Sequence, residues 1–477
     1  MAQTTDEPRT EGPRSPGPGP SGHDSSAPPA QPGPSVQELL DTETRPVPAA
    51  LRDRSRAPLG TGSVDRERYT SYAWHRLEVE RLWRRVWQMA CREEDIPEVG
   101  DHIVYDIVDD SLIVVRTAPD EVRAFHNSCL HRGTTLCAEA GRSESFACPF
   151  HGWTWDLEGR LVGIPSDWDF GHIDPADHSL PAARVATWGG FVFVNLDAEA
   201  ESFESYLENL PEQFTDWALE DRVKAVHVCK TFACNWKVAL EAFIESYHVI
   251  ATHPQILGST GDANTQYDTW PAVRHVNRMI TPFAVASPFV AAETSEQEVA
   301  ESMLKIGTGG KPVEVDVPDG ISARAFMAEN MRSNLGRAFG VDLSDYSDSE
   351  MLDAIEYYLF PNFAPWAGVL QGITYRFRPD GDNPDRCLMD IMLLRPVAED
   401  EARPAPAAMR EIGVDEGFDV APELGGLVGI LSQDASNLPR VQRGLKSSGY
   451  GRVNLGEYQE SRIRHFHQTL TEYLERA

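Results

Sequence analysis

The pattern of hydrophobic and polar residues predicts one helix followed by a run of short strands up to about residue 200. Four large hydrophobic residues recur at helical spacing among arginines and glutamates: Val79, Leu82, Trp83 and Val86. Beyond them, Asp- and Pro-containing turns at 109–110 and 119–120 separate short β-like runs. These runs lie at 102–107, 111–116, 122–125, 145–147, 154–156 and 190–195. The section is therefore expected to form a small all-β unit.

The remainder of the chain has a mixed pattern. Helices are predicted at 237–250, 322–339, 349–358 and 456–477. Two antiparallel strands are predicted at 374–378 and 387–394, separated by the turn Pro379-Asp-Gly-Asp. The polar, amphipathic insert at 297–357 is a candidate lid or entrance for a pocket. These elements indicate an α+β chain.

Residues 1–62 differ from everything that follows. Prolines alternate there with glycine, serine and alanine. Such a segment cannot bury enough apolar surface to offset the conformational entropy that ordering would cost. We therefore expect a disordered tail over this range.

Net charge, apolar runs and cysteine count limit which kinds of partner and cell compartment the protein can have. The chain carries 43 Lys+Arg and 74 Asp+Glu, a formal net charge of −31, which repels phosphate backbones and anionic membrane surfaces. We therefore expect neither a nucleic-acid partner nor a membrane partner. Apolar runs long enough to span a membrane and a basic-then-apolar start are both missing from the sequence. Seven cysteines are too few for a disulfide scaffold, which favours a reducing cytoplasm with free or metal-bound thiols.

Two short segments each combine one cysteine with one histidine. They are Cys129-Leu-His131-Arg-Gly and Cys148-Pro-Phe-His151-Gly-Trp. Thiolates suit iron–sulfur clusters or zinc, but a structural zinc finger usually presents a Cys pair and then a His pair. The order Cys, His, Cys, His instead fits a Rieske 2Fe–2S centre, in which two cysteines bind one iron and two histidines bind the other. Cys137 lacks a His partner at the right offset and is interpreted as a packing residue.

A second group contains Glu245, His248 and His253. Glu245 and His248 are three residues apart and would share one face of a helix. His253 would lie about 140° further around an ideal helix, so both imidazoles reach one ion only if the helix distorts or ends. Pro254 supplies a stop. Two histidines and one carboxylate form the facial triad of non-haem Fe(II) oxygenases. The third ligand is either Glu245 or a distant acid.

With both motifs in this order, the chain resembles the catalytic α subunit of the Rieske non-haem iron oxygenases of the ring-hydroxylating type, over about residues 65–477. The resemblance implies Fe(II) ligands His248, His253 and Asp434, the last in the segment 432–444. It also implies that Glu245 bridges the two metal sites across a subunit boundary, between His248 and the Rieske histidine His151 of the neighbouring subunit. The chain departs from the family at Ala242, where relatives often have an asparagine.

The resemblance further implies a domain arrangement and partners. An N-terminal helix and Rieske domain would occupy 63–200, and a catalytic domain 201–477, built on a curved antiparallel sheet with a long helix (helix-grip type). Subunits would form head-to-tail trimers, with or without a small β subunit. Over residues 63–477 the chain contains neither a G-x-G-x-x-G dinucleotide fingerprint nor a plant-type ferredoxin cysteine cluster. NAD(P)H would therefore act only through a separate reductase, with or without a ferredoxin.

The implied activity is hydroxylation of an aromatic or other apolar substrate with O2, as a monooxygenase or a dioxygenase. The alternatives are a Rieske oxygenase for demethylation or oxidative cyclisation, an electron-transfer Rieske protein, and a zinc-stabilised binding module. Candidates for an apolar pocket wall are Phe283, Phe289, Phe326, Met327, Phe360, Phe363 and Trp366.

Overall fold

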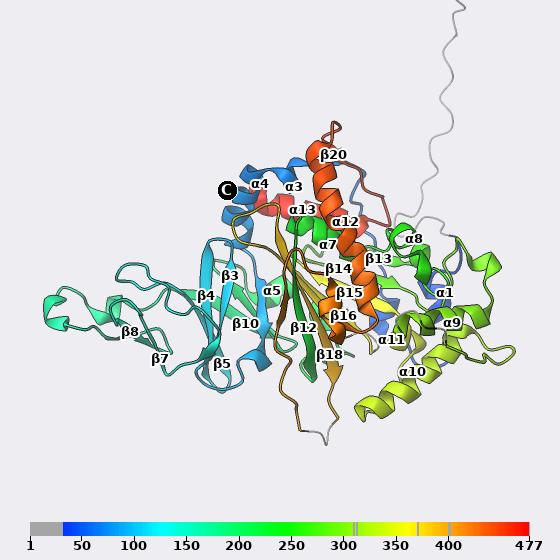
Figure 1. The fold of residues 1–477 in the computed structure, drawn as a ribbon, viewed down its shortest axis with the longest axis horizontal. Coiled ribbons are helices and arrows are strands. Elements are labelled where there is room, and N and C mark those ends of the chain that lie inside the picture. Colours follow the sequence, from blue (N-terminus) through cyan, green and yellow to red (C-terminus); the bar gives the residue numbers. More distant parts are fainter. Residues whose placement is uncertain (1–31, 309–310, 312, 370–371, 399–401, 477) are drawn as a thin grey trace, which may run out of the picture.

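The computed structural model describes residues 32–308, 311, 313–369, 372–398 and 402–476. A β-rich part lies on one side of the molecule, a large curved sheet with covering helices lies at its centre, and a helical insert lies on the other side (Figure 1). Among the described residues no helix is long and apolar enough to cross a membrane.

The first part is all β, as the sequence predicted. Its main sheet has seven strands in the order β2-β11-β10-β5-β4-β3-β6. Their bounds are β2 Gln88–Arg92, β3 Asp101–Ile107, β4 Asp110–Ala118, β5 Glu121–His126, β6 Gly141–Arg142, β10 Ala182–Trp188 and β11 Phe191–Asn195. A separate three-stranded sheet contains β7 Ser145–Ala147, β8 Thr154–Asp156 and β9 Leu161–Gly163.

The small sheet packs on the larger one through a compact hydrophobic cluster. Ile113 and Val115 of β4 contribute to it, together with Phe125 of β5 and Trp155 of β8. Cys129 and Cys148 are buried in the same cluster. The loops that carry the Cys–His motifs therefore stand on a rigid base.

The central sheet has eight strands in the order β13-β14-β15-β16-β17-β18-β12-β19. All pairs are antiparallel except β12 with β19. The bounds are β12 Arg222–Phe232, β13 Gln266–Thr269, β14 Val276–Thr281, β15 Ala354–Leu359, β16 Phe363–Ala367, β17 Ile373–Pro379, β18 Cys387–Pro396 and β19 Arg410–Ile412. The predicted strands at 374–378 and 387–394 are confirmed as β17 and β18.

Three helices pack against this curved sheet, which gives the expected helix-grip arrangement. They are α7 Trp236–Phe243, α12 Leu427–Ser447 and α13 Ser461–Glu475. Shorter helices precede them: α3 Glu67–Thr70, α4 Tyr72–Glu78, α5 Phe203–Leu207 and α6 Leu210–Gln213. The predicted helix around residues 79–86 is a π-helical turn, Val79–Trp83, that continues α4. The chain ends beside α3 and α4 (Figure 1).

The insert contains α9 Glu296–Gly307, α10 Ala323–Phe339 and α11 Asp348–Leu352. The helix predicted at 322–339 is confirmed. The helix predicted at 349–358 is wrong in its second half, because residues 354–359 form strand β15, buried at every position. A strand hydrogen-bonded on both sides inside a core has no polar face, so its sequence lacks the alternation that would identify it.

The disordered tail expected over 1–62 needs a correction. Residues 1–31 lie outside the described residues, but 32–62 have defined structure with α1 Val36–Leu40 and α2 Ala49–Arg52. Three hydrophobic side chains anchor this segment in the main core: Val36, Leu40 and Leu51. Strand β1 Val64–Asp65 then pairs with β20 Arg452–Val453. The composition did not predict this order, because the few apolar residues of the segment bury their surface against another part of the chain.

Candidate metal centres

The helix predicted at 237–250 breaks in the middle, and this break places two histidines. Asn235 caps the start of α7 by accepting a hydrogen bond from the Lys237 amide. The helix ends at Phe243, and the short helix α8 Val249–Thr252 follows after a bend. His248 and His253 flank α8 on its two sides. α8 then ends at Thr252, directly before His253 and Pro254, and this helix end, which the spacing of the two histidines required, lets both imidazoles face one point.

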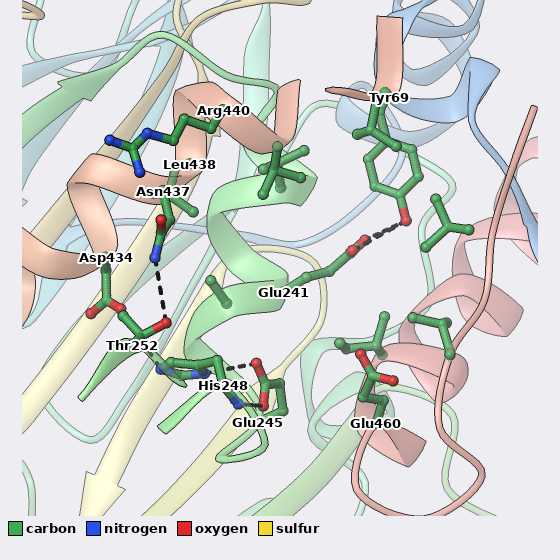
Figure 2. A pocket seen from close by; sticks show the side chains of 17 residues that line it. Tyr69, Glu241, Glu245, His248, Thr252, Asp434, Asn437, Leu438, Arg440 and Glu460 are labelled. Atoms are coloured by element: carbon green, nitrogen blue, oxygen red, sulfur yellow. Dashed lines mark hydrogen bonds and ion pairs between the residues drawn. The ribbon is translucent and has the colours of Figure 1, made fainter. Parts of the chain in front are cut away.

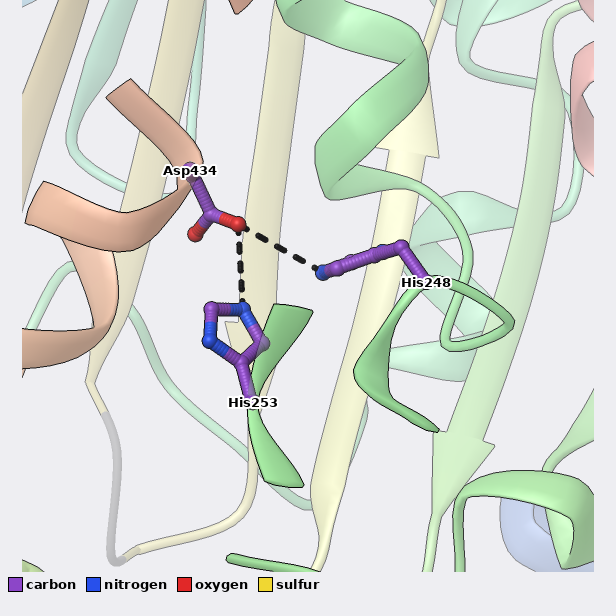
Figure 3. A group of neighbouring side chains, drawn as sticks. All are labelled: His248, His253 and Asp434. Atoms are coloured by element: carbon purple, nitrogen blue, oxygen red, sulfur yellow. Dashed lines mark ion pairs between the residues drawn. The ribbon is translucent and has the colours of Figure 1, made fainter. Parts of the chain in front are cut away.

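His248, His253 and Asp434 come together at that point (Figure 3). One ligand atom of each lies within 4.8 Å of the others. The Oδ1 atom of Asp434 is 3.0 Å from Nε2 of His253 and 3.7 Å from Nε2 of His248. Asp434 comes from α12, so the third donor reaches the site from a distant part of the chain. We call these three residues the triad.

The outer nitrogen of each triad histidine is held by a neighbouring side chain. Nδ1 of His248 lies 2.7 Å from Glu245 Oε1, and the His248 amide donates to Glu245 Oε2 at 3.0 Å. Nδ1 of His253 lies 2.8 Å from Oε1 of Gln433. An Nδ1–H that donates to these oxygens leaves the Nε2 lone pair free for a metal ion. The donor set therefore fits a facial Fe(II) site.

Electrostatics at the triad agree with this geometry. Burial lowers the pKa of His248, but the Glu245 and Asp434 carboxylates outweigh burial and hold that pKa above its usual value. An ion here would replace the proton on His248, because a histidine binds metal only in its neutral form. Gln433 is a residue that the sequence analysis missed, since a glutamine beside Asp434 belongs to no recognisable spacing.

The two Cys–His segments form matching loops at the edge of the β-rich part. Gly133 donates from its amide to the Cys129 carbonyl at 2.8 Å, and Gly152 donates to the Cys148 carbonyl at 3.0 Å. Both glycines have positive φ, 79° and 74°, which side chains rarely tolerate. Each cysteine therefore opens a tight turn that brings its own histidine back toward it.

The two thiols lie beside each other, and so do the two imidazoles. The rings of His131 and His151 have centroids 4.6 Å apart, and His131 stacks on Trp153. Nδ1 of His131 is buried and has no hydrogen-bond partner among the described residues, as expected of a metal-ligand atom. Burial raises the pKa of Cys148, yet hydrogen bonds from backbone amides outweigh it and lower that pKa. These residues fit a Rieske cluster.

The other cysteines agree with their interpretation as packing residues. Cys137 contacts the hydrophobic cluster beneath the loops. The remaining four are buried: Cys91, Cys229, Cys234 and Cys387. The Sγ atoms of Cys234 and Cys387 lie 3.8 Å apart, a contact that the sequence did not predict.

Two cavities meet at the triad, and both are lined by Ala242, Glu245, His248 and Asp434. The smaller has a volume of about 380 Å³ and contains two further carboxylates, those of Glu241 and Glu460 (Figure 2). Tyr69 donates a hydrogen bond to Glu241. No side-chain amide stands at position 242, so the departure from the family leaves an apolar spot between the cavities.

The larger cavity has a volume of about 570 Å³ and is mostly apolar. Of the predicted wall residues, Phe283 and Trp366 line it. Five others do not: Phe360 and Phe363 lie in the main core, Met327 and Phe326 belong to the insert's core, and Phe289 is exposed.

Comparison with known proteins agrees with both centres. The family description "Ring hydroxylating alpha subunit (catalytic domain)" matches residues 207–476, and "Rieske [2Fe-2S] domain" matches residues 86–170. The glycine betaine monooxygenase oxygenase subunit of Pseudomonas aeruginosa (strain UCBPP-PA14) is 30% identical over 221 residues, 46% of this chain and 51% of the relative. The biphenyl 2,3-dioxygenase subunit alpha of Rhodococcus jostii (strain RHA1) is 35% identical over 200 residues, 40% and 43% of the two chains. The matched region thus spans about half the length of these curated relatives.

Solved structures share the fold. A quaternary ammonium Rieske monooxygenase superposes with a TM-score of 0.63 at 18% identity, covering 89% of this chain and all of the other. A naphthalene 1,2-dioxygenase variant bound to phenanthrene superposes with a TM-score of 0.59 at 18% identity, covering 88% and 93%. With the catalytic description matching more than half of its length, this chain belongs to the family of ring-hydroxylating oxygenase alpha subunits, oxidoreductases with a Rieske [2Fe-2S] domain and a catalytic domain that binds mononuclear iron.

Proposed function

We propose that the protein is the terminal oxygenase component of a cytoplasmic system that hydroxylates an aromatic or other apolar organic substrate with O2. The observation that carries this proposal is the meeting of the triad with a large apolar cavity in a chain that also holds a complete Cys–His pair of loops. An electron-transfer protein would need no second metal site beside a cavity. A zinc-stabilised module would need neither of them.

The residues divide the work. Cys129, His131, Cys148 and His151 hold the Rieske cluster, while His248, His253 and Asp434 hold Fe(II). When bound, the cluster supplies single electrons and the iron supplies O2 activation beside the substrate. Gln433 and Glu245 keep the two triad histidines in the orientation and tautomer that direct both Nε2 atoms at the ion. The apolar wall of the larger cavity keeps bulk water from the reacting substrate.

Glu245 has a second role in this proposal. Its side chain faces the smaller cavity as well as His248 (Figure 2). In a head-to-tail trimer, a Rieske histidine of the neighbouring subunit would enter this cavity and donate to the same carboxylate. Leu130 and Phe150, beside the Rieske ligands, are exposed in the isolated chain, as residues that dock on a neighbour would be.

The catalytic unit begins after about residue 200 in this arrangement, and the Rieske unit with its N-terminal helix occupies 63–200. Electrons come from an NAD(P)H-dependent reductase, with or without a ferredoxin, and a small β subunit is an optional member of the assembly. A basic patch on the electron donor would match the net charge of −31.

Spectroscopy with metal analysis tests the proposal. Anaerobically purified protein should show a Rieske-type signal on reduction with dithionite, with about three irons and two sulfides per chain. Zinc without a reducible chromophore would refute the oxygenase assignment. A reducible cluster with only about two irons per chain, even after incubation with ferrous iron, would leave an electron-transfer protein as the better account.

A second function, demethylation or oxidative cyclisation, uses the same two centres. Mass spectrometry of products formed under ¹⁸O2 separates the possibilities. Two labelled oxygens in one product indicate dioxygenation and one indicates monooxygenation, while loss of a one-carbon fragment or ring closure without label indicates the alternatives.

A further inference from the structure

The larger cavity exceeds what a single aromatic ring needs. Its volume is about 570 Å³, whereas an apolar cavity of roughly 150 Å³ is enough to hold benzene. A one-ring molecule would leave most of the space to water and could turn freely. It would then present no fixed bond to the triad. The volume therefore favours a substrate of three or four fused rings.

The wall of this cavity offers few polar groups to a ligand. The hydroxyls of Ser246 and Thr281 lie 2.6 Å apart, and Thr281 is also 2.9 Å from the Thr265 hydroxyl. These groups bind one another instead of a ligand. Two further hydroxyls line the wall: Ser259 accepts a hydrogen bond from Ser302 at 3.2 Å, and Thr260 Oγ1 has no hydrogen-bond partner among the described residues. Most of the remaining wall is hydrocarbon, including Phe243, Met279, Phe283, Ile373, Leu393 and Leu431. A ligand that buries apolar surface gains most from such a wall.

The charged groups of the cavity give a cationic ligand no carboxylate partner away from the metal site. Within the described lining, the acidic side chains are Asp434 and Glu245, both at the triad. Asp434 faces both triad histidines, and Glu245 accepts two hydrogen bonds from one of them. The charged residue of the lining outside this group is Arg395, a cation itself. A quaternary ammonium group would therefore have to rely on aromatic faces of the wall, such as those of Trp366 and Tyr375, without a carboxylate beside it.

One wall of the cavity comes from the insert. Met303 of α9 and Met331 and Phe339 of α10 line it. The insert has a hydrophobic core of its own, and Arg324 of α10 pairs with Asp353 at 2.6 Å. Its backbone is thus held in place, while methionine side chains adapt to the shape of a ligand. Such a wall selects molecules by length without taking part in chemistry.

We propose that the substrate is a neutral molecule of three or four fused rings, and that Met303, Met331 and Phe339 determine the largest molecule that the cavity accepts. The inference rests on the proposed function only in taking this cavity as the substrate site. The insert, expected from the sequence to be a lid or entrance, then forms the wall that determines specificity.

Equilibrium dialysis of the anaerobic holoenzyme tests the proposal with three probes: phenanthrene, indole and γ-butyrobetaine. Phenanthrene should bind at least about tenfold more tightly than indole, because it fills more of the cavity. γ-Butyrobetaine should bind more weakly than both. Indole binding as tightly as phenanthrene would overturn the size argument. Tighter binding of γ-butyrobetaine would overturn the charge argument.

The substitution Met331→Trp tests the insert wall, and Met409→Trp, at an exposed position, is its matched control. Met331→Trp should weaken phenanthrene binding at least about tenfold and change indole binding less than about twofold, while the control leaves both unchanged. Unchanged phenanthrene binding in Met331→Trp would refute the role of the wall. Should that variant not fold, Phe339→Ala enlarges the same wall and should improve binding of the four-ring probe pyrene relative to indole, and no relative gain would equally refute it.

The outcome can be separated from that of the proposed function. A protein that lacks mononuclear iron but binds phenanthrene as described refutes the oxygenase assignment and leaves the cavity's selectivity intact. A protein that hydroxylates indole or γ-butyrobetaine with O2 and does not bind phenanthrene refutes this inference and keeps the oxygenase assignment.

Discussion

Replacing Gln433 by leucine should weaken binding of the mononuclear iron without touching any ligand. The Oε1 atom of Gln433 lies 2.8 Å from Nδ1 of His253, whose side chain is only 2% exposed. Leucine is similar in size but accepts no hydrogen bond. The substitution would leave a buried N–H group without a partner and would free the imidazole to rotate or change tautomer.

The expected magnitude follows from this one contact. Losing a buried hydrogen bond and leaving its donor unsatisfied costs about 1–3 kcal/mol. At about 1.4 kcal/mol for each factor of ten, iron affinity should fall between roughly 5-fold and 150-fold. Outer residues that orient metal-bound histidines are typically worth about 10- to 100-fold, which agrees.

Titration of ferrous iron into protein stripped of its mononuclear iron, with a competing chelator, measures this loss. The visible spectrum of the cluster monitors the other centre in the same sample and should not change. Gln255→Leu is the matched control, because Gln255 donates to Gln433 at 2.7 Å but, in the part of the chain that the structure describes, its side chain makes no hydrogen bond to His253. An iron affinity within twofold of wild type in Gln433→Leu would refute the idea that this amide orients His253.

Further predictions concern both centres and the core. Asp434→Ala should lose the mononuclear iron and keep the visible spectrum of the cluster, as metal analysis would show; retained iron would exclude it as a ligand. Glu245→Gln should keep both metals but uncouple oxidation of the reduced cluster from product formation in single-turnover experiments, and normal coupling would contradict the bridging role. Lys237→Met strips the fully buried Glu78 of its 2.6 Å ion pair and should lower the free energy of unfolding by about 3–5 kcal/mol in denaturant titrations. Burial raises the pKa of Glu356 from 4.5 to about 8, so the folded state keeps a proton that the unfolded state releases. Its contribution to stability is therefore lost as pH rises from about 4.5 to about 8, and Glu356→Gln should remove this part of the pH dependence of thermal unfolding.

The ligands of the Rieske centre could be predicted from the sequence because the ligands of each loop lie close together in the chain. Cys129 with His131 and Cys148 with His151 identify a Rieske centre by residue type and order alone. The strands around them were also predicted, since half-buried strands alternate between polar and apolar residues. The requirement for a break between His248 and His253 followed from helix geometry.

The third donor and its surroundings depended on the tertiary structure. Spacing left the choice between Glu245 and a distant acid open, and only the resemblance named Asp434. The fold brings Asp434 to Nε2 of both triad histidines and leaves Glu245 on Nδ1 of His248. Gln433, next along the same helix, reaches His253 only because α12 packs beside α8.

The remaining differences between the predictions from the sequence and the structure have one physical cause. Residues 354–359 form a strand and 32–62 an ordered segment because both bury apolar surface against parts of the chain that are remote in sequence. The insert wall of the large cavity is likewise assembled from helices whose own pattern shows only amphipathicity. The sequence alone determined which chemical groups are present and how each short loop can fold. Packing between distant segments decided which of them meet, because burial free energy depends on the partner surface and not on local order.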